Sequence, residues 1–175
     1  MANIDSEMLA VIKYATTMEI GGRSFYEHVA DVTENKLGKK MFRKLAEDES
    51  VHLKTFGDMF TDILGSEEWR KYLNQEEYKK DTVVQELKER IEKQGTKGHA
   101  SELEALRIGM ELERKSIDHY EKAAKEAKEA KAKEVFSKII KEEMYHYDLL
   151  QAQYDNITGS GFWFDIAEFK MDAKY

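Results

Sequence analysis

The sequence predicts an all-α fold: a four-helix bundle made of two helical hairpins that a long crossover joins. Proline is absent from the 175 residues, so long helices meet no obligatory break. Four long segments repeat apolar residues every three or four positions, which is the period of one helix face. The second half of the chain also repeats the first at an offset of 94 residues, the separation of Glu49 from Glu143. These three observations predict two similar hairpins, one after the other.

The first hairpin is predicted to pair a helix over residues 6–31 with a helix over residues 39–64. The first helix is expected to stop near "TENKLG", where polar residues and a glycine interrupt the periodic pattern. The second is expected to stop at Gly65, because glycine often follows a helix C-terminus. The short connection between them makes the two helices antiparallel neighbours.

The second hairpin is predicted to pair a helix over residues 101–127 with a helix over residues 133–156. Ser101 and Glu104 have the spacing of a capping box, which places the start of the third helix at Ser101. The fourth helix is expected to stop near Gly159.

The whole chain, residues 1–175, is therefore predicted to be a single domain. Its parts are a helix pair at 6–64, a crossover at 66–100, a second helix pair at 101–157 and an aromatic tail at 158–175. The charged crossover is predicted to contain short helices around Glu67–Leu73 and Thr82–Gln94. One long crossover between two helix pairs is the ferritin-like connection. For the tail, a lid packed over the bundle end and a dimer contact are both favoured over a ligand site.

Composition excludes several classes of function. The chain has no Cys, so disulfides, Cys-bound zinc, iron–sulfur clusters and thiol nucleophiles are excluded. A net charge of −7 argues against nucleic acid as a partner. The N-terminal "MANIDSEMLA" lacks a basic-then-apolar leader, and no apolar run approaches the ~18 residues of a membrane span. The sequence therefore predicts a cytoplasmic protein with no membrane partner.

Two short stretches carry the candidate chemistry. "ESVH" at residues 49–52 and "EMYH" at residues 143–146 each place a His three residues after a Glu, and the 94-residue offset relates them. In their helices these residues continue the apolar stripe, so the pattern assigns them to the core. A Glu in each of the other two helices also continues the apolar stripe of its helix and is therefore assigned to the core. The predicted set is Glu19, Glu49, His52, Glu113, Glu143 and His146.

These six side chains are predicted to lie at one level of the bundle. Measured from the first turn, Glu19 and the Glu49–His52 pair differ by only ~2 Å along the helix axis. A buried, unpaired carboxylate normally takes up a proton or finds a cation. Four carboxylates would neutralise two divalent ions, and mixed imidazole and carboxylate donors suit Fe or Mn better than Ca or Mg. The set therefore predicts two metal ions per chain, with Fe the expected metal and Mn or a mixed pair left open.

The chain resembles the rubrerythrin-like branch of the ferritin superfamily over roughly residues 5–157. The resemblance rests on "MEIGGRSFYEHVA", "AEDESVHLKTF", "ELERKSIDHYEKAA" and "KEEMYHYDLL". The roles that it implies are bridging carboxylates for Glu49 and Glu143, terminal carboxylates for Glu19 and Glu113, and one imidazole ligand per metal for His52 and His146.

Two further features each have two interpretations. Tyr26 and Tyr120 resemble the family's phenols that hydrogen-bond to ligand carboxylates, and plain core packing is the alternative for both. Gly21 and Gly22 lie two and three residues after the Glu of the first helix. They either allow tight helix packing or leave room for an oxidant beside the metals.

Two departures from the family bear on function. Rubrerythrins carry a further Glu where this chain has Ser116, and they carry a Cys-rich rubredoxin domain that a chain without Cys cannot form. Redox-linked ligand exchange and a built-in electron relay are therefore not implied. The resemblance implies a homodimeric, non-haem di-iron oxidoreductase that reduces hydrogen peroxide or dioxygen with electrons from a separate donor protein.

The alternative function is ferritin-type Fe(II) oxidation for iron storage or handling, which a large hollow assembly would favour. A third interpretation is a structural or regulatory metal-binding bundle without turnover.

Overall fold

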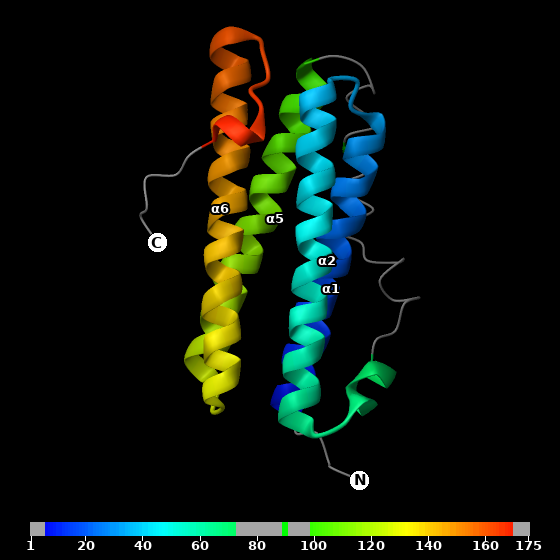
Figure 1. The fold of residues 1–175 in the computed structure, drawn as a ribbon, viewed down its shortest axis with the longest axis vertical. Helices are drawn as coiled ribbons and strands as arrows, with labels where there is room; N and C mark the ends of the chain where they lie inside the picture. The colour runs from blue at the N-terminus through cyan, green and yellow to red at the C-terminus, as the bar shows by residue number, and fades with distance from the viewer. Residues whose placement is uncertain (1–5, 73–88, 91–98, 170–175) are drawn as a thin grey trace.

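The computed structural model describes residues 6–72, 89–90 and 99–169, which form an all-α bundle. Four long helices make two antiparallel hairpins (Figure 1). The elements in chain order are α1 (Ser6–Val32), α2 (Lys36–Leu64), the 3₁₀ helix η1 (Glu67–Tyr72), α5 (His99–Glu126), α6 (Ala130–Ser160) and the 3₁₀ helix η2 (Ile166–Glu168). The predicted fold class is confirmed, and none of the described helices is both long and apolar enough to cross a membrane.

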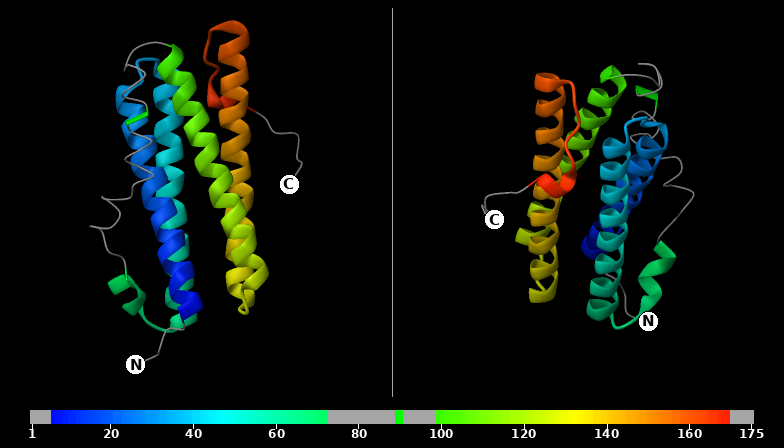
Figure 2. Two further views of the ribbon diagram at one scale, coloured as in Figure 1. Left: turned by 180° about the vertical axis from the view of Figure 1, so that it is seen from behind. Right: turned by 45° about the horizontal axis from the view of Figure 1, so that its top comes forward.

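The two hairpins keep the 94-residue offset in their helix boundaries. α1 ends at Val32 and α5 at Glu126, while α2 begins at Lys36 and α6 at Ala130. Opposite views show α2 and α6 on one face of the bundle and α1 and α5 on the other (Figures 1 and 2). Each helix of one hairpin therefore lies next to its repeat-related counterpart in the other.

Local capping chemistry explains where two helices depart from the expected boundaries. α2 begins at Lys36 because the side chain of Asn35 accepts hydrogen bonds from the backbone N–H groups of the next turn, at 2.9 and 3.2 Å. α6 continues through Gly159, where a stop was expected, and ends at Gly161. Gly161 has a φ of 78° and donates its N–H to the Ile157 carbonyl at 2.8 Å, a left-handed C-terminal cap that favours glycine.

The capping box expected at Ser101 is wrong. α5 begins at His99, so Ser101 lies inside the helix, and Glu104 instead accepts a hydrogen bond from Arg90 at 2.7 Å. In the crossover, the first expected short helix corresponds to η1. The second expected short helix lies outside the described residues, apart from the helical residues 89–90.

The apolar core has two parts, one toward each end of the bundle. One cluster contains Phe25, Phe42 and Leu150, and the other contains Phe56 and Phe136, all at 2% exposure or less. Burying each such side chain contributes roughly 1.5–3 kcal/mol to stability. The two clusters hold the four helices together on either side of a layer of buried charged residues.

Two tryptophans, themselves 94 residues apart, pack against glycines of α2. Trp69 of η1 lies over Gly57 and donates its indole N–H to Thr61 Oγ1 at 2.9 Å. Trp163, in the tail after α6, lies over Gly38 and donates to Glu102 Oε2 at 3.1 Å. The described part of the tail therefore packs on its own chain, as the lid interpretation requires.

Replacing Gly38 should destabilise the fold, because a Cβ there would lie 2.9 Å from the Trp163 ring. Overpacking of ~1–3 kcal/mol should outweigh the ~0.5–1 kcal/mol gained by replacing a helical glycine. We expect Gly38→Ala to lower the melting temperature by a few degrees, measured by circular dichroism. The matched control is Gly159→Ala, which meets nothing within 4 Å and should raise it. Equal shifts in the two variants would contradict the packing of Trp163 on Gly38.

Candidate metal centre

The layer between the two apolar clusters is built by all four long helices. α1 and α5 each contribute one Glu, and α2 and α6 each contribute a Glu and a His one turn apart. The residues are Glu19, Glu49, His52, Glu113, Glu143 and His146, all at 4% exposure or less. The prediction that these six side chains are buried and meet at one level is confirmed. They form two groups of four, each of which could hold a metal ion.

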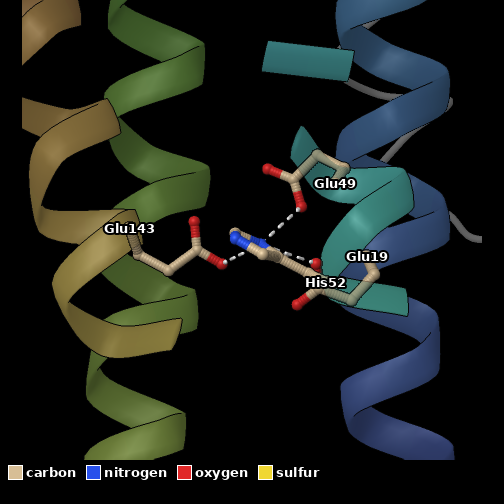
Figure 3. Close-up of side chains that lie close together, drawn as sticks. All are labelled: Glu19, Glu49, His52 and Glu143. Carbon is tan, nitrogen blue, oxygen red and sulfur yellow. Dashed lines mark ion pairs between the residues drawn. The ribbon is translucent and has the colours of Figure 1, made fainter. Parts of the chain in front are cut away.

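The first group surrounds the ring of His52 (Figure 3). The Nδ1 atom of His52 lies 3.3 Å from Glu19 Oε2, 3.4 Å from Glu143 Oε1 and 3.8 Å from Glu49 Oε2. These three carboxylates come from α1, α6 and α2, so the group draws on both hairpins.

The second group surrounds His146 in the same manner. Its Nδ1 lies 3.2 Å from Glu143 Oε2, 3.7 Å from Glu113 Oε1 and 3.9 Å from Glu49 Oε1. Glu49 and Glu143 thus belong to both groups, and each directs one carboxylate oxygen toward each imidazole. The two imidazole rings lie 5.6 Å apart, centroid to centroid.

Two acidic residues that the sequence analysis missed lie behind the imidazoles. His52 Nε2 lies 2.7 Å from Glu142 Oε2, and His146 Nε2 lies 3.5 Å from Asp48 Oδ2. A carboxylate at Nε2 holds the proton there, so that Nδ1 can direct its lone pair into the centre. The 94-residue offset also relates Asp48 to Glu142, so the repeat contained the signal that would have found them.

Two buried phenols link α1 and α5 across the centre. Tyr26 on α1 donates its hydroxyl to Glu113 Oε1 on α5, and Tyr120 on α5 donates to Glu19 Oε1 on α1. Burial and the adjacent Glu raise the pKa of each tyrosine well above its ordinary value, so both phenols remain protonated donors. Both interpretations of these tyrosines therefore hold, because they fill the core and also bond to the acidic cluster.

Glu49, Glu113 and the two imidazoles bind protons more tightly than they would in water, whereas hydrogen bonds from both imidazoles outweigh burial and lower the pKa of Glu143. Burial, together with Glu143 and Glu19, raises the pKa of Glu49 well above its ordinary value. Burial and the charge of Glu143 raise the pKa of Glu113 to about 8. The pKa of both imidazoles is also raised, because the surrounding carboxylates outweigh the effect of burial. The cluster thus demands positive charge, which protons supply when no metal is bound.

The donor atoms of the first group fit a cation. Glu19 Oε2, His52 Nδ1 and Glu143 Oε1 are buried and have no hydrogen-bond partner among the described residues. Buried polar atoms are rarely left unsatisfied in native structures. Three such atoms that face one another, and that can all donate a lone pair, are the ligand set that a metal ion of the Fe or Mn type takes.

Gly22 of α1 lies tightly against Glu49 of α2. A Cβ at Gly22 would lie 3.2 Å from Glu49 Cδ, so the space that the glycine leaves is filled by the Glu49 carboxylate. This supports the tight-packing interpretation at Gly22. The residue 94 positions later is Ser116, which is also small and buried.

Comparison with known proteins identifies the architecture. A family model described as Rubrerythrin matches residues 10–154. This range contains all six clustered side chains and both tyrosines. Searches of curated proteins and of solved structures found no match.

Removing an outer carboxylate should weaken metal binding without unfolding the chain. We expect Glu142→Ala to lower the affinity for Mn(II) by ~10–100-fold, because His52 loses the group that orients it. The measurement is a titration against a competing chelator. The matched control is Glu134→Ala, an exposed acid two turns earlier on the same helix. Unchanged affinity in the Glu142 variant would show that the outer carboxylate does not orient the imidazole.

Metal binding should release protons. With its pKa at about 8, Glu113 carries a proton near neutral pH in the metal-free chain, and a carboxylate ligand must give that proton up. Affinity for Mn(II) should therefore rise as the pH is raised through that value and fall as it is lowered. Calorimetry in two buffers of different ionisation enthalpy would count the released protons. A pH-independent affinity with no proton release would contradict this electrostatic picture.

Proposed function

The chain belongs to the rubrerythrin family, and from that premise we propose that it is a non-haem di-iron oxidoreductase that reduces hydrogen peroxide or dioxygen. The observation that carries the proposal is the pair of overlapping donor groups, in which Glu49 and Glu143 direct one oxygen toward each imidazole. Carboxylates shared in this way are what a pair of neighbouring metal ions requires.

The proposed ligand roles follow from this arrangement. Glu49 and Glu143 would bridge the two irons, Glu19 and His52 would complete one site, and Glu113 and His146 would complete the other. Two ferrous ions would balance the four carboxylates, which makes their burial tolerable. Mn(II) or a mixed pair would satisfy the same donors.

Bound iron would supply the electron transfer by changing between ferrous and ferric states. The chain supplies what surrounds it. Tyr26 and Tyr120 donate hydrogen bonds to Glu113 Oε1 and Glu19 Oε1 and so fix the orientation of these carboxylates. The apolar clusters on either side keep bulk water from the layer. Reduction of one hydrogen peroxide consumes two electrons and two protons and yields two waters, so a separate electron donor is required.

The function is tested by single turnover. We expect protein loaded anaerobically with Fe(II) to bind two ions per chain, by metal analysis, and to be oxidised by a stoichiometric amount of peroxide in stopped-flow absorbance. The control is the double variant Glu49→Ala/Glu143→Ala, which should keep its helical circular dichroism, since apolar packing carries most helix stability, and lose the reaction.

The same experiment distinguishes an oxidoreductase from the alternative function, ferritin-type iron handling. An oxidoreductase should react again each time a chemical reductant restores the ferrous state, without further iron. Ferritin-type handling would instead consume added Fe(II) far beyond two per chain and retain it in a large hollow assembly, seen by light scattering. Binding of a single ion per chain, or no reaction with either oxidant, would overturn the proposal.

A further inference from the structure

Five cations gather on the exposed side of the first three turns of α2. They are Lys36, Lys39, Lys40, Arg43 and Lys44, and with Glu47 and Ile166 they line a surface groove of about 430 Å³. We call these five residues the lysine face. It stands out on a chain whose net charge is −7.

Folding does not explain the lysine face. The N-terminus of a helix carries a partial positive charge, so cations there are unfavourable, and α2 has no acidic residue in its first turn. Like charges three and four residues apart on a helix also repel one another. Lys40 pairs with Asp165 at 2.9 Å and Lys44 pairs with Asp48, but Lys36, Lys39 and Arg43 have no ion pair among the described residues. The charge is therefore held at some cost to stability.

One side chain, Asp48, lies between Lys44 of the lysine face and His146 of the candidate metal centre. Lys44 donates to Asp48, and Asp48 lies 3.5 Å from Nε2 of His146. On the inner side of the same ring, Nδ1 lies 3.2 Å from Glu143. The Asp48 side chain is 26% exposed, so only one carboxylate and one imidazole separate the surface from the buried cluster.

The internal repeat supplies a natural comparison. On α6 the same connection recurs, because Lys138 pairs with Glu142 at 3.9 Å and Glu142 contacts His52. The charge around it does not recur. The five counterparts of the lysine face are Ala130, Lys133, Glu134, Ser137 and Lys138, which carry a net charge of +1 where the lysine face carries +5. When Glu47 of the same groove and its counterpart Lys141 are counted as well, the net charges are +4 on α2 and +2 on α6. Two equivalent routes into the centre thus differ in the charge at their entrance.

We propose that the lysine face is the docking surface for the electron donor, a protein with an acidic surface around a one-electron redox centre. This inference rests on the proposed function. Complementary charge would steer such a donor to the entrance beside Asp48 and His146 and away from the α6 side. Each docking event transfers one electron, and the donor is oxidised by one electron. Two events supply the two electrons that, with two protons, convert one hydrogen peroxide into two waters.

Binding is tested first on the metal-free protein, with a plant-type [2Fe–2S] ferredoxin of acidic isoelectric point as the probe. The test variant is K36E/K39E/R43E, and the matched control is K131E/K133E/K141E, which makes the same change in net charge on α6. We expect the test variant to lose at least about tenfold in affinity at low ionic strength, within the range of electrostatic steering. The control should lose little. The difference should vanish at about 1 M salt, where the Debye length is about 3 Å.

Misfolding is not expected to confuse the result, because Glu near a helix N-terminus is stabilising. In the iron-loaded protein, reduction by the ferredoxin should slow by a similar factor in the test variant. Reduction by dithionite, followed by reoxidation with peroxide, should be unchanged. Equal ferredoxin affinities in the two triple variants would overturn the docking proposal. If the dithionite-reduced wild-type protein does not react with peroxide, the proposed function is overturned instead. The docking proposal is then still tested by the ferredoxin affinities of the metal-free proteins.

Discussion

Four carboxylates are buried in the middle of the helical bundle, and the rest of the structure depends on how their charge is stabilised. Left alone, such charges would cost several kcal/mol each or would force the groups to take up protons. Burial raises the pKa of Glu49 and Glu113, in the direction that this cost predicts, while hydrogen bonds from the imidazoles lower the pKa of Glu143. Two tyrosines and two outer acids bond to the layer, and apolar clusters pack on either side of it.

Polar contacts of this layer join the two hairpins, in addition to those within each hairpin, such as His52 with Glu19 and His146 with Glu143. Each phenol bonds to a Glu of the other hairpin, and each imidazole contacts an outer acid of the other hairpin: Tyr26 with Glu113, Tyr120 with Glu19, His52 with Glu142 and His146 with Asp48. Networks of this kind in a low-dielectric interior strengthen one another. The candidate metal centre is therefore also the principal polar connection between the two halves of the bundle.

The helical periodicity and the 94-residue repeat were enough to predict the helices and the six clustered side chains, because both patterns appear in the sequence as fixed spacings. Periodicity did not reveal Asp48 and Glu142, since an acid beside the core stripe looks the same as a solvated surface residue, and only the 94-residue offset relates the two. Trp163 packs on Gly38, which lies far from it in the sequence, and no local sequence pattern predicts such a contact. The stop of α6 was predicted at Gly159 and lies at Gly161, because "GSG" offers two glycines and only backbone geometry selects between them. The ligand roles of the six residues remain a prediction.

The 94-residue offset has a consequence for ancestry. Each hairpin carries one Glu, one Glu-x-x-His, one tyrosine and one outer acid, which is half of every element in the centre. A hairpin of this kind can complete the centre only by pairing with a second one, so the present chain is the expected product of duplication and fusion of a gene whose product paired with itself. Two such hairpins in one chain would no longer have to stay identical. Each half could then keep its buried residues while its surface diverged, as the unequal charges of α2 and α6 record.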